Sequence, residues 1–300
     1  MKKIVKTGLI AGAFLTEEIY RYIFCRNGSP ILNRLFDKKG HEDGYYEFRD
    51  SSADRLRATP QQRFYIFSRR GCRLSGHYIR CGGDGRRIAF IVHGYRSEHA
   101  ETAGMFLDYY RSRGIDVFAP DNTAAGESEG HLIGFDVYES QDCLDWIDFL
   151  RKKFGPDVQI ILHGFSMGGA TVLKMSDKCP ENVKFIVSDS GYMDADCIFK
   201  ARLGILKEPM NIINRLVAGY FMADTSVISS LERSSVPILF VHGTEDRTVT
   251  FAQGEELYRL YGGEKDCLFP ENTRHIESMY TSGEDYSRKL DNFIEKYIRR

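Results

Sequence analysis

The chain has 300 residues, and its 41 lysine and arginine residues are balanced by 42 aspartate and glutamate residues, a net charge of −1. A nearly neutral chain provides no overall basic field, so we expect no nucleic-acid partner. Hydrophobic residues make up 42% of the sequence and aromatic residues 13%, which excludes a disordered chain, and the length allows two domains or one large α/β unit.

Residues 1–44 form a basic and apolar N-terminal arm. The first 40 residues contain eight basic and three acidic side chains, a net charge of +5 that leaves −6 for the rest of the chain. Apolar residues at spacings of three to four predict a helix with one apolar face: Leu9, Ile10, Ala13, Phe14, Tyr20 and Ile23. We favour a helix packed on the body. Two alternatives stay open: peripheral contact of residues 1–40 with an anionic membrane surface, and a processed secretory signal.

Strand-like and helix-like stretches alternate after the arm. Residues 62–68 and 74–80 flank a turn with a glycine and predict an antiparallel hairpin. Apolar runs predict further strands at residues 87–93, 116–119, 158–162, 183–188, 237–241 and 267–269, with helices near 105–113, 136–154, from 168 onward and 286–298. The alternation predicts an α/β fold with a mostly parallel central sheet flanked by helices. In such sheets ligands bind beyond the carboxyl ends of the strands.

The strongest motif is Gly164-Phe165-Ser166-Met167-Gly168-Gly169, directly after one predicted strand and before a helix. In a sharp strand-to-helix turn, side chains at Gly164 and Gly168 would collide with the neighbouring strand and helix, whereas the turn exposes the hydroxyl of Ser166. The motif therefore predicts Ser166 as a nucleophile.

A serine nucleophile requires a base and an acid that orients the base. Asp246 follows the last strongly apolar strand, and His275 lies 29 residues further on in a polar loop. The order Ser166, Asp246, His275 is the order of the triad in one particular fold. We therefore predict that these three residues are catalytic.

A loop after the strand at 87–93 contains His93-Gly94-Tyr95. Glycine at 94 would let the loop approach the serine, so we expect the backbone N–H groups of Tyr95 and Met167 to bind the oxyanion. We expect His93, and His242 in a similar sequence before Gly243, to make structural hydrogen bonds.

With these motifs, the chain from about residue 62 to the end resembles the α/β-hydrolase superfamily, and within it bacterial esterases, lysophospholipases and serine aminopeptidase-like hydrolases. The resemblance includes the loop 121–130, although the family often has an arginine where this chain has Thr123. It implies a hydrolase core in two parts, residues 45–190 and 236–300, with a helical lid inserted at 191–235.

The resulting hypothesis is a serine hydrolase that cleaves a small-molecule carboxylic ester with a medium acyl or aromatic group. A serine aminopeptidase, with Asp194, Asp196 or Glu208 holding the substrate's amino group, and a lysophospholipase or monoacylglycerol lipase are the alternatives. We expect no metal and no other cofactor, because nucleotide-binding glycine patterns and clustered histidines are missing from the sequence. Seven scattered cysteines without a C-x-x-C pair fit a reducing, cytoplasmic compartment.

Overall fold

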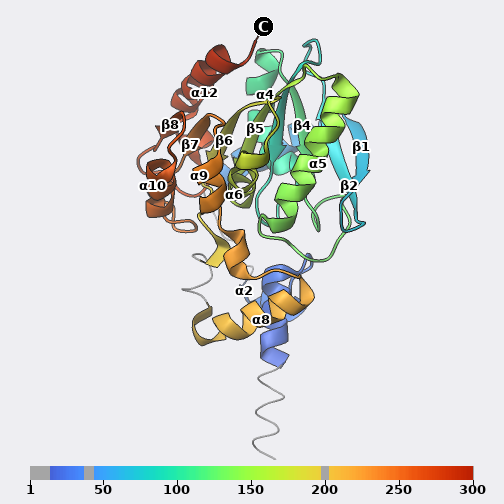
Figure 1. The fold of residues 1–300 in the computed structure, drawn as a ribbon, viewed down its shortest axis with the longest axis vertical. Coiled ribbons are helices and arrows are strands. Elements are labelled where there is room, and N and C mark those ends of the chain that lie inside the picture. The colour runs from blue at the N-terminus through green and yellow to red at the C-terminus, as the bar shows by residue number, and fades with distance from the viewer. Residues whose placement is uncertain (1–13, 37–43, 197–202, 300) are drawn as a thin grey trace, which may run out of the picture.

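The structure is a computed structural model, and it describes residues 14–36, 44–196 and 203–299. Its centre is one eight-stranded sheet with the spatial order β1-β2-β4-β3-β5-β6-β7-β8 (Figure 1). In chain order the strands are β1 (Gln62–Phe67), β2 (Arg73–Ile79), β3 (Arg87–Val92), β4 (Asp116–Pro120), β5 (Gln159–Phe165), β6 (Val183–Asp189), β7 (Ile238–Val241) and β8 (Lys265–Leu268). Strands β3 to β8 are parallel, whereas β2 is antiparallel to both β1 and β4, so the predicted hairpin lies at one edge.

Helices cover both faces of the sheet because its central strands are apolar on both sides. In β3, Ile88 and Phe90 belong to one buried cluster and Ala89 and Ile91 to the other, as the alternation of side chains along a strand requires. The helices on the first face are α5 (Val137–Phe154), α6 (Met167–Lys174), α9 (Ile228–Arg233) and α10 (Phe251–Leu260), and those on the second are α3 (Gly44–Ala58), α4 (His99–Ser112) and α12 (Gly283–Tyr297).

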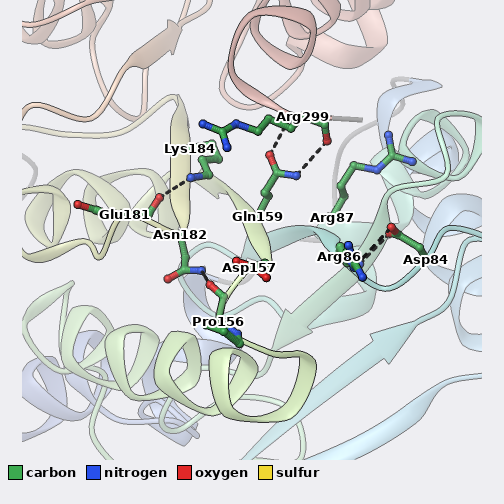
Figure 2. A pocket seen from close by; sticks show the side chains of 10 residues that line it. All are labelled: Asp84, Arg86, Arg87, Pro156, Asp157, Gln159, Glu181, Asn182, Lys184 and Arg299. Carbon is green, nitrogen blue, oxygen red and sulfur yellow. Dashed lines mark hydrogen bonds and ion pairs between the residues drawn. The ribbon is translucent and has the colours of Figure 1, made fainter.

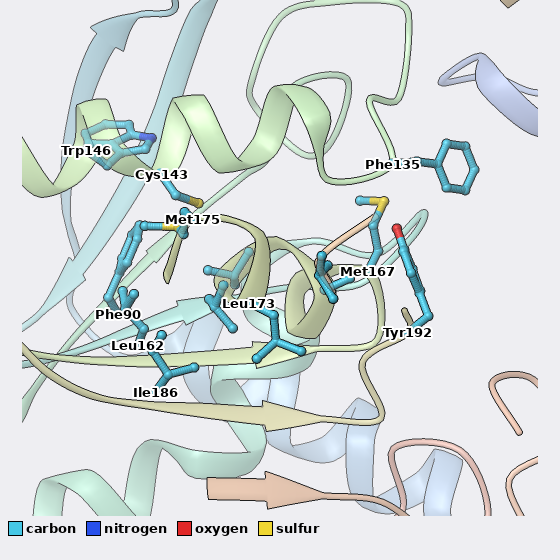
Figure 3. Close-up of a cluster of buried hydrophobic side chains, with 14 of the residues drawn as sticks. Phe90, Phe135, Cys143, Trp146, Leu162, Met167, Leu173, Met175, Ile186 and Tyr192 are labelled. Atoms are coloured by element: carbon cyan, nitrogen blue, oxygen red, sulfur yellow. The ribbon is translucent and has the colours of Figure 1, made fainter. Parts of the chain in front are cut away.

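Figure 3 shows the packing on the first face. Phe90 and Leu162 come from neighbouring strands, and Trp146 and Cys143 of α5 lie above them. Leu173 of α6 lies between the sheet and α5. Helix α6, which begins next to Ser166, is therefore a buried part of the core. A helix fixed in this way holds its first turn in a defined position.

The structure corrects three details of the sequence analysis. Helix α4 begins at His99, earlier than expected, and β5 extends to Phe165, so the motif starts inside a strand. Helix α3 was not predicted, because its buried residues are few and two of them, Ser52 and Ala53, are small. The remaining short elements are α2 (Pro30–Phe36), α8 (Lys207–Val217), α11 (Ser278–Thr281) and the 3₁₀ turns Ser176–Lys178, Gly204–Leu206 and Met222–Thr225.

Residues 14–24 are helical, and we call them the arm helix. The arm helix packs on the body as favoured above: the carbonyl of Ile23 accepts a hydrogen bond from Tyr95 Oη (2.8 Å), and Cys25 pairs with Leu132 in an isolated β-bridge. Residues 1–13 lie outside the described residues, and they include Leu9, Ile10 and Ala13 of the predicted apolar face. No helix within the described ranges is long and apolar enough to cross a membrane.

The lid range 191–235 contains two different parts. Helix α9 packs against α6 and belongs to the covering of the sheet, whereas α8 lies beside the arm helix at one end of the molecule (Figure 1). Tyr20 of the arm helix donates a hydrogen bond from Oη to Asn214 Oδ1 of α8 (3.3 Å). Residues 197–202 of the lid range lie outside the described residues.

The contact between α3 and α4 provides a test of this architecture. A Cβ atom at Gly104 would lie 2.5 Å from the carbonyl oxygen of Ser52, so a larger residue must force the two helices apart. We expect Gly104→Val to lower the free energy of unfolding by about 1–3 kcal/mol, measured by urea denaturation. Gly262→Ala is the control, since its Cβ would meet no atom within 4 Å. Equal stability of both variants would show that α3 does not pack here.

Candidate active site

Ser166 lies in the turn between β5 and α6, at the carboxyl edge of the sheet. Its backbone is strained, with φ of 53° and ψ of −116°, a conformation that residues with a side chain rarely adopt. The N–H of Ser166 donates to the carbonyl of Asp189 at the end of the neighbouring strand β6 (2.8 Å). Strand β6 therefore holds the strained turn from one side.

Glycines make the turn sterically feasible, as the sequence analysis predicted. A Cβ at Gly164 would lie 2.1 Å from the carbonyl oxygen of Gly168 in the helix, and a Cβ at Gly168 would lie 2.1 Å from that of Val92 in β3. Both contacts are far shorter than any that atoms tolerate. The predicted elbow glycines are thus required by close backbone approach.

The structure brings the three predicted catalytic side chains together. His275 Nε2 lies 2.8 Å from Ser166 Oγ, and His275 Nδ1 lies 2.6 Å from Asp246 Oδ2. Asp246 follows β7, and His275 lies in the loop after β8, so both occupy the same edge of the sheet as Ser166. This geometry lets the imidazole accept a proton at Nε2 while Nδ1–H donates to the carboxylate.

Asp246 is held as a carboxylate. Its Oδ1 accepts the backbone N–H groups of Thr248 (2.8 Å) and Val249 (2.9 Å). Burial alone would raise the pKa of Asp246, but hydrogen bonds from His242 and His275 outweigh burial and hold this pKa well below its ordinary value. His242 therefore supports the carboxylate, and its Nε2 also lies 2.9 Å from the carbonyl of Val249.

The loop with His93, Gly94 and Tyr95 passes beside the serine. A Cβ at Gly94 would lie 3.3 Å from Ser166 Cβ, so the glycine permits the close approach. His93 stays inside the loop, where Nε2 accepts the N–H of Asn122 (2.9 Å) and Nδ1 faces the carbonyl of Gly94 (2.8 Å), and burial lowers its pKa. This is the structural role expected of His93.

Two residues at the end of β6, Asp189 and Ser190, support the site and were missed by the sequence analysis. Ser190 Oγ accepts the backbone N–H of Ile276, next to His275, and donates to Asp189 Oδ1 (2.9 Å). The hydroxyl of Tyr286 in α12 also donates to Asp189 (3.1 Å), and burial raises the pKa of Asp189 to about 6. Asp189 thus connects the serine turn, through its backbone carbonyl, with the histidine loop, through Ser190. Because ligands bind beyond the carboxyl ends of the strands, the position of Asp189 directly after a predicted strand could have indicated it as a site residue.

The loop 121–130 has its own bracing. Arg70, from the hairpin turn, donates to Thr123 Oγ1 (2.9 Å), and Thr123 Oγ1 donates to Asp142 Oδ2 (2.5 Å). An arginine therefore contacts Thr123 from a different part of the chain, the hairpin turn.

One group in the described residues has the composition of a metal site. His77, His99 and Asp121 are buried, and one donor atom of each lies within 4.8 Å of the others. However, the two imidazole rings are stacked at 3.5 Å with only 4° between their planes, so their in-plane lone pairs run parallel instead of converging on one ion. Asp121 already accepts the N–H groups of His99 and Glu127. The group fits a brace for the loop better than it fits a metal.

A cavity of about 620 Å³ opens next to Ser166 and is mainly apolar. The arm helix contributes much of its wall, and the turn before α8 contributes another part. The lining residues are Leu15, Ile19, Tyr22, Ile23, Leu32, Tyr95, Arg96, Phe135, Ser166, Met167, Tyr192, Leu203, Leu206, Thr248 and Val249. The arm is thus part of the candidate site, a role that the sequence analysis did not foresee.

A second cavity, of about 510 Å³, lies at the opposite edge of the sheet, around the starts of β3, β5 and β6 (Figure 2). Its lining is polar. Gln159 Nε2 donates a hydrogen bond to the carbonyl of Arg299 (2.9 Å), and Gln159 Oε1 accepts one from the N–H of Arg299 (2.7 Å). It is remote from Ser166 and contains none of the predicted site residues.

The sheet order, the covering helices and the serine turn define an α/β-hydrolase fold. Residues 83–203 match the family described as "Serine aminopeptidase, S33". Among solved structures, an esterase of Pyrococcus furiosus has a TM-score of 0.65 at 18% identity and covers 82% of this chain and 94% of its own. Est1E of Butyrivibrio proteoclasticus, with ferulic acid bound, has a TM-score of 0.60 at 16% identity, covering 79% of this chain and 100% of its own. The chain therefore has the α/β-hydrolase fold.

Two curated proteins extend the comparison. The protein YqkD of Bacillus subtilis is 23% identical over 98% of this chain and 98% of its own length, so the similarity includes the arm. The monoglyceride lipase of Mus musculus is 30% identical over 132 residues, which cover 41% of this chain and 43% of the lipase. Among these similar proteins, one is named as an esterase and one as a monoglyceride lipase.

Two buried carboxyl groups lie at the start of α5, next to Phe135 of the cavity wall. Glu139 Oε1 accepts the N–H of Gly134 (2.8 Å), whereas Oε2 has no hydrogen-bond partner among the described residues. Burial raises the pKa of Glu139 to about 7 and that of Asp136 well above its ordinary value. Both carboxyl groups therefore keep their protons to a higher pH in the folded protein than in the unfolded chain.

This arrangement predicts how stability changes with pH. The native state keeps the proton of Glu139 up to about pH 7, whereas the unfolded chain loses it near pH 4.5, so stability should fall as pH rises between these values. We expect Glu139→Gln to make the free energy of unfolding less dependent on pH between 4.5 and 7. At pH 8 it should raise this free energy by about 1–3 kcal/mol, measured by denaturant titration. Glu255→Gln, on the exposed side of α10, is the matched control. The same pH slope in both variants would contradict the assignment.

Proposed function

We propose that this protein is a serine hydrolase that cleaves carboxylic esters through an acyl-enzyme on Ser166. The observation that carries the proposal is the hydrogen-bonded chain from Ser166 through His275 to Asp246, with Ser166 at the wall of an apolar cavity. A hydroxyl, an imidazole and an ionised carboxylate in this order form a nucleophile, a general base and an orienting acid.

In the acylation step, Ser166 Oγ attacks the ester carbonyl carbon while His275 Nε2 takes the hydroxyl proton. The carbonyl oxygen becomes an oxyanion, which the backbone N–H groups of Tyr95 and Met167 stabilise. Because Met167 is the first residue of α6, the positive end of that helix also stabilises the oxyanion. The bond to the leaving oxygen then breaks, His275 returns the proton to that oxygen, and the alcohol departs.

In the deacylation step, water replaces the alcohol. His275 takes a proton from the water, whose oxygen attacks the acyl carbon and forms a second oxyanion in the same place. Collapse of this intermediate breaks the bond to Ser166 Oγ, which recovers its proton from His275, and a carboxylic acid is released. Asp246 stays ionised throughout and stabilises the imidazolium.

The cavity favours a medium acyl chain or an aromatic group as the acyl part. Tyr22, Phe135 and Tyr192 supply aromatic surface, and leucine and isoleucine side chains supply most of the rest. The ferulic acid bound to Est1E and the name of the mouse monoglyceride lipase support an aromatic and a fatty acyl group respectively. A lysophospholipid or monoacylglycerol remains the alternative substrate class, since it would place its acyl chain in the same cavity.

An aminopeptidase activity has less support. Asp196 is paired with Lys207 (2.7 Å), and Glu208 is exposed on α8. None of the described residues that line the cavity is acidic, so the lining offers no carboxylate to a substrate's ammonium group. The ester hypothesis therefore agrees better with the cavity.

Substitution of the triad tests the mechanism. We expect Ser166→Ala and His275→Ala to lower kcat for a p-nitrophenyl ester by about 10⁴ or more and Asp246→Asn to lower it somewhat less. Ser51→Ala, an exposed serine on α3, should retain full activity. Ordinary turnover by purified Ser166→Ala would disprove the mechanism.

A substrate series tests the acyl preference. With p-nitrophenyl esters of increasing chain length, we expect kcat/KM to rise from acetate to a medium chain, by roughly tenfold for each pair of methylenes that the cavity buries. Aminoacyl anilides should be poor substrates. A higher kcat/KM for anilides than for any ester would instead support the aminopeptidase alternative.

A further inference from the structure

The molecule has an unusual concentration of exposed apolar side chains at the end that contains the arm helix and α8. Eleven large hydrophobic residues are exposed in the described ranges, and seven of them lie here. We call these seven the outer apolar surface: Phe14, Leu15, Ile31, Ile212, Leu216, Val217 and Phe221. In Figure 1 the arm helix, α2 and α8 gather beyond one end of the sheet. An apolar surface of this kind marks an interaction site.

Helix α8 is apolar on the side that faces away from the body. Met210 and Asn214 are fully buried and face the arm helix and the core, whereas Ile212 and Leu216 are 57% and 80% exposed. Ile212 and Leu216 are four residues apart and therefore lie on one stripe of the helix. Glu208 begins this stripe, but its next two positions are apolar, whereas a helix that only covered a soluble core would present charged residues there.

The outer apolar surface is continuous with the candidate active site. Leu15 belongs to the surface, where it is 52% exposed, and it also lines the cavity that contains Ser166. Leu206, directly before α8, lines the same cavity. The mouth of the cavity therefore opens at this surface, and an acyl chain could enter it from an apolar phase without crossing water.

The charge of this part of the chain indicates what covers the outer apolar surface. In the sequence the first 40 residues have a net charge of +5, and among the described residues Arg34 is exposed on α2 and Arg215 lies between Ile212 and Leu216 on α8. The guanidinium of Arg215 also lies 5.4 Å from the ring centre of Phe221. Two copies of this surface would bring like charges together, whereas an anionic bilayer supplies both hydrocarbon and opposite charge.

We propose that the outer apolar surface docks on an anionic lipid bilayer, with the apolar residues in the boundary between headgroups and acyl chains. Docking turns the mouth of the cavity toward the lipid. The arm helix then has two roles, because it forms both the cavity wall and part of the docking surface. The docking proposal goes beyond the hydrolase proposal and does not depend on turnover, since binding can be measured without substrate.

The experiment is co-sedimentation of the full chain with vesicles. We expect binding to phosphatidylcholine vesicles with about 30% phosphatidylglycerol, and at least about tenfold weaker binding to pure phosphatidylcholine or at high salt. The double substitution Ile212→Ser/Leu216→Ser should lower the partition coefficient at least about tenfold. The matched control is Phe67→Ser, a 72% exposed residue of β1 at the edge of the sheet. Circular dichroism and hydrolysis of a water-soluble ester check that each variant is folded.

Three outcomes would overturn the proposal. The first is that the wild-type chain does not bind the anionic vesicles. The second is that the control variant loses as much binding as the double variant. The third is that the double variant converts a dimer into a monomer while vesicle binding stays unchanged, which would show that a second copy covers the surface. Each outcome is independent of the esterase assay, so loss of docking and loss of catalysis are distinguishable.

Discussion

The strained backbone at Ser166 is the feature on which the rest of the site depends. A positive φ at a residue with a side chain costs about 1–3 kcal/mol, and such strain persists only where its surroundings enforce it. Here the enforcing contacts are the hydrogen bond to Asp189, the buried helix α6 and the backbone packing that Gly164 and Gly168 permit. The strain directs the hydroxyl out of the sheet and toward His275, and the first N–H groups of α6 toward the same space.

The chain assembles this space from segments that are far apart in the sequence. Tyr95 illustrates the assembly: its backbone belongs to the loop beside the serine, and its side chain bonds to the arm helix and stacks on Phe135 at 5.3 Å. A shift of the arm helix would therefore reach the loop beside the serine as well as the cavity wall. The proposed acyl binding and the proposed contact with lipid both involve the same few turns of helix.

The predictions from sequence succeeded where chemistry is local and failed where it depends on packing. The serine motif, the aspartate after β7 and the histidine after β8 each follow a strand, so their order predicted the grouping that the structure contains. Arg70 and Thr123 are 53 residues apart, and no local pattern indicates that they meet. Helix α3 has too few apolar residues to show a periodicity, and the arm helix has the pattern of any packed helix, so its place on the cavity wall was not predictable.

The most direct test of the account is a crystal structure of the protein after reaction with an alkyl fluorophosphonate of medium chain length. The account predicts phosphorus bonded to Ser166 Oγ, a phosphonyl oxygen that accepts the N–H groups of Tyr95 and Met167, and an alkyl chain between the arm helix and the turn before α8. Reaction at another residue, or an alkyl chain that leaves the arm helix untouched, would contradict it.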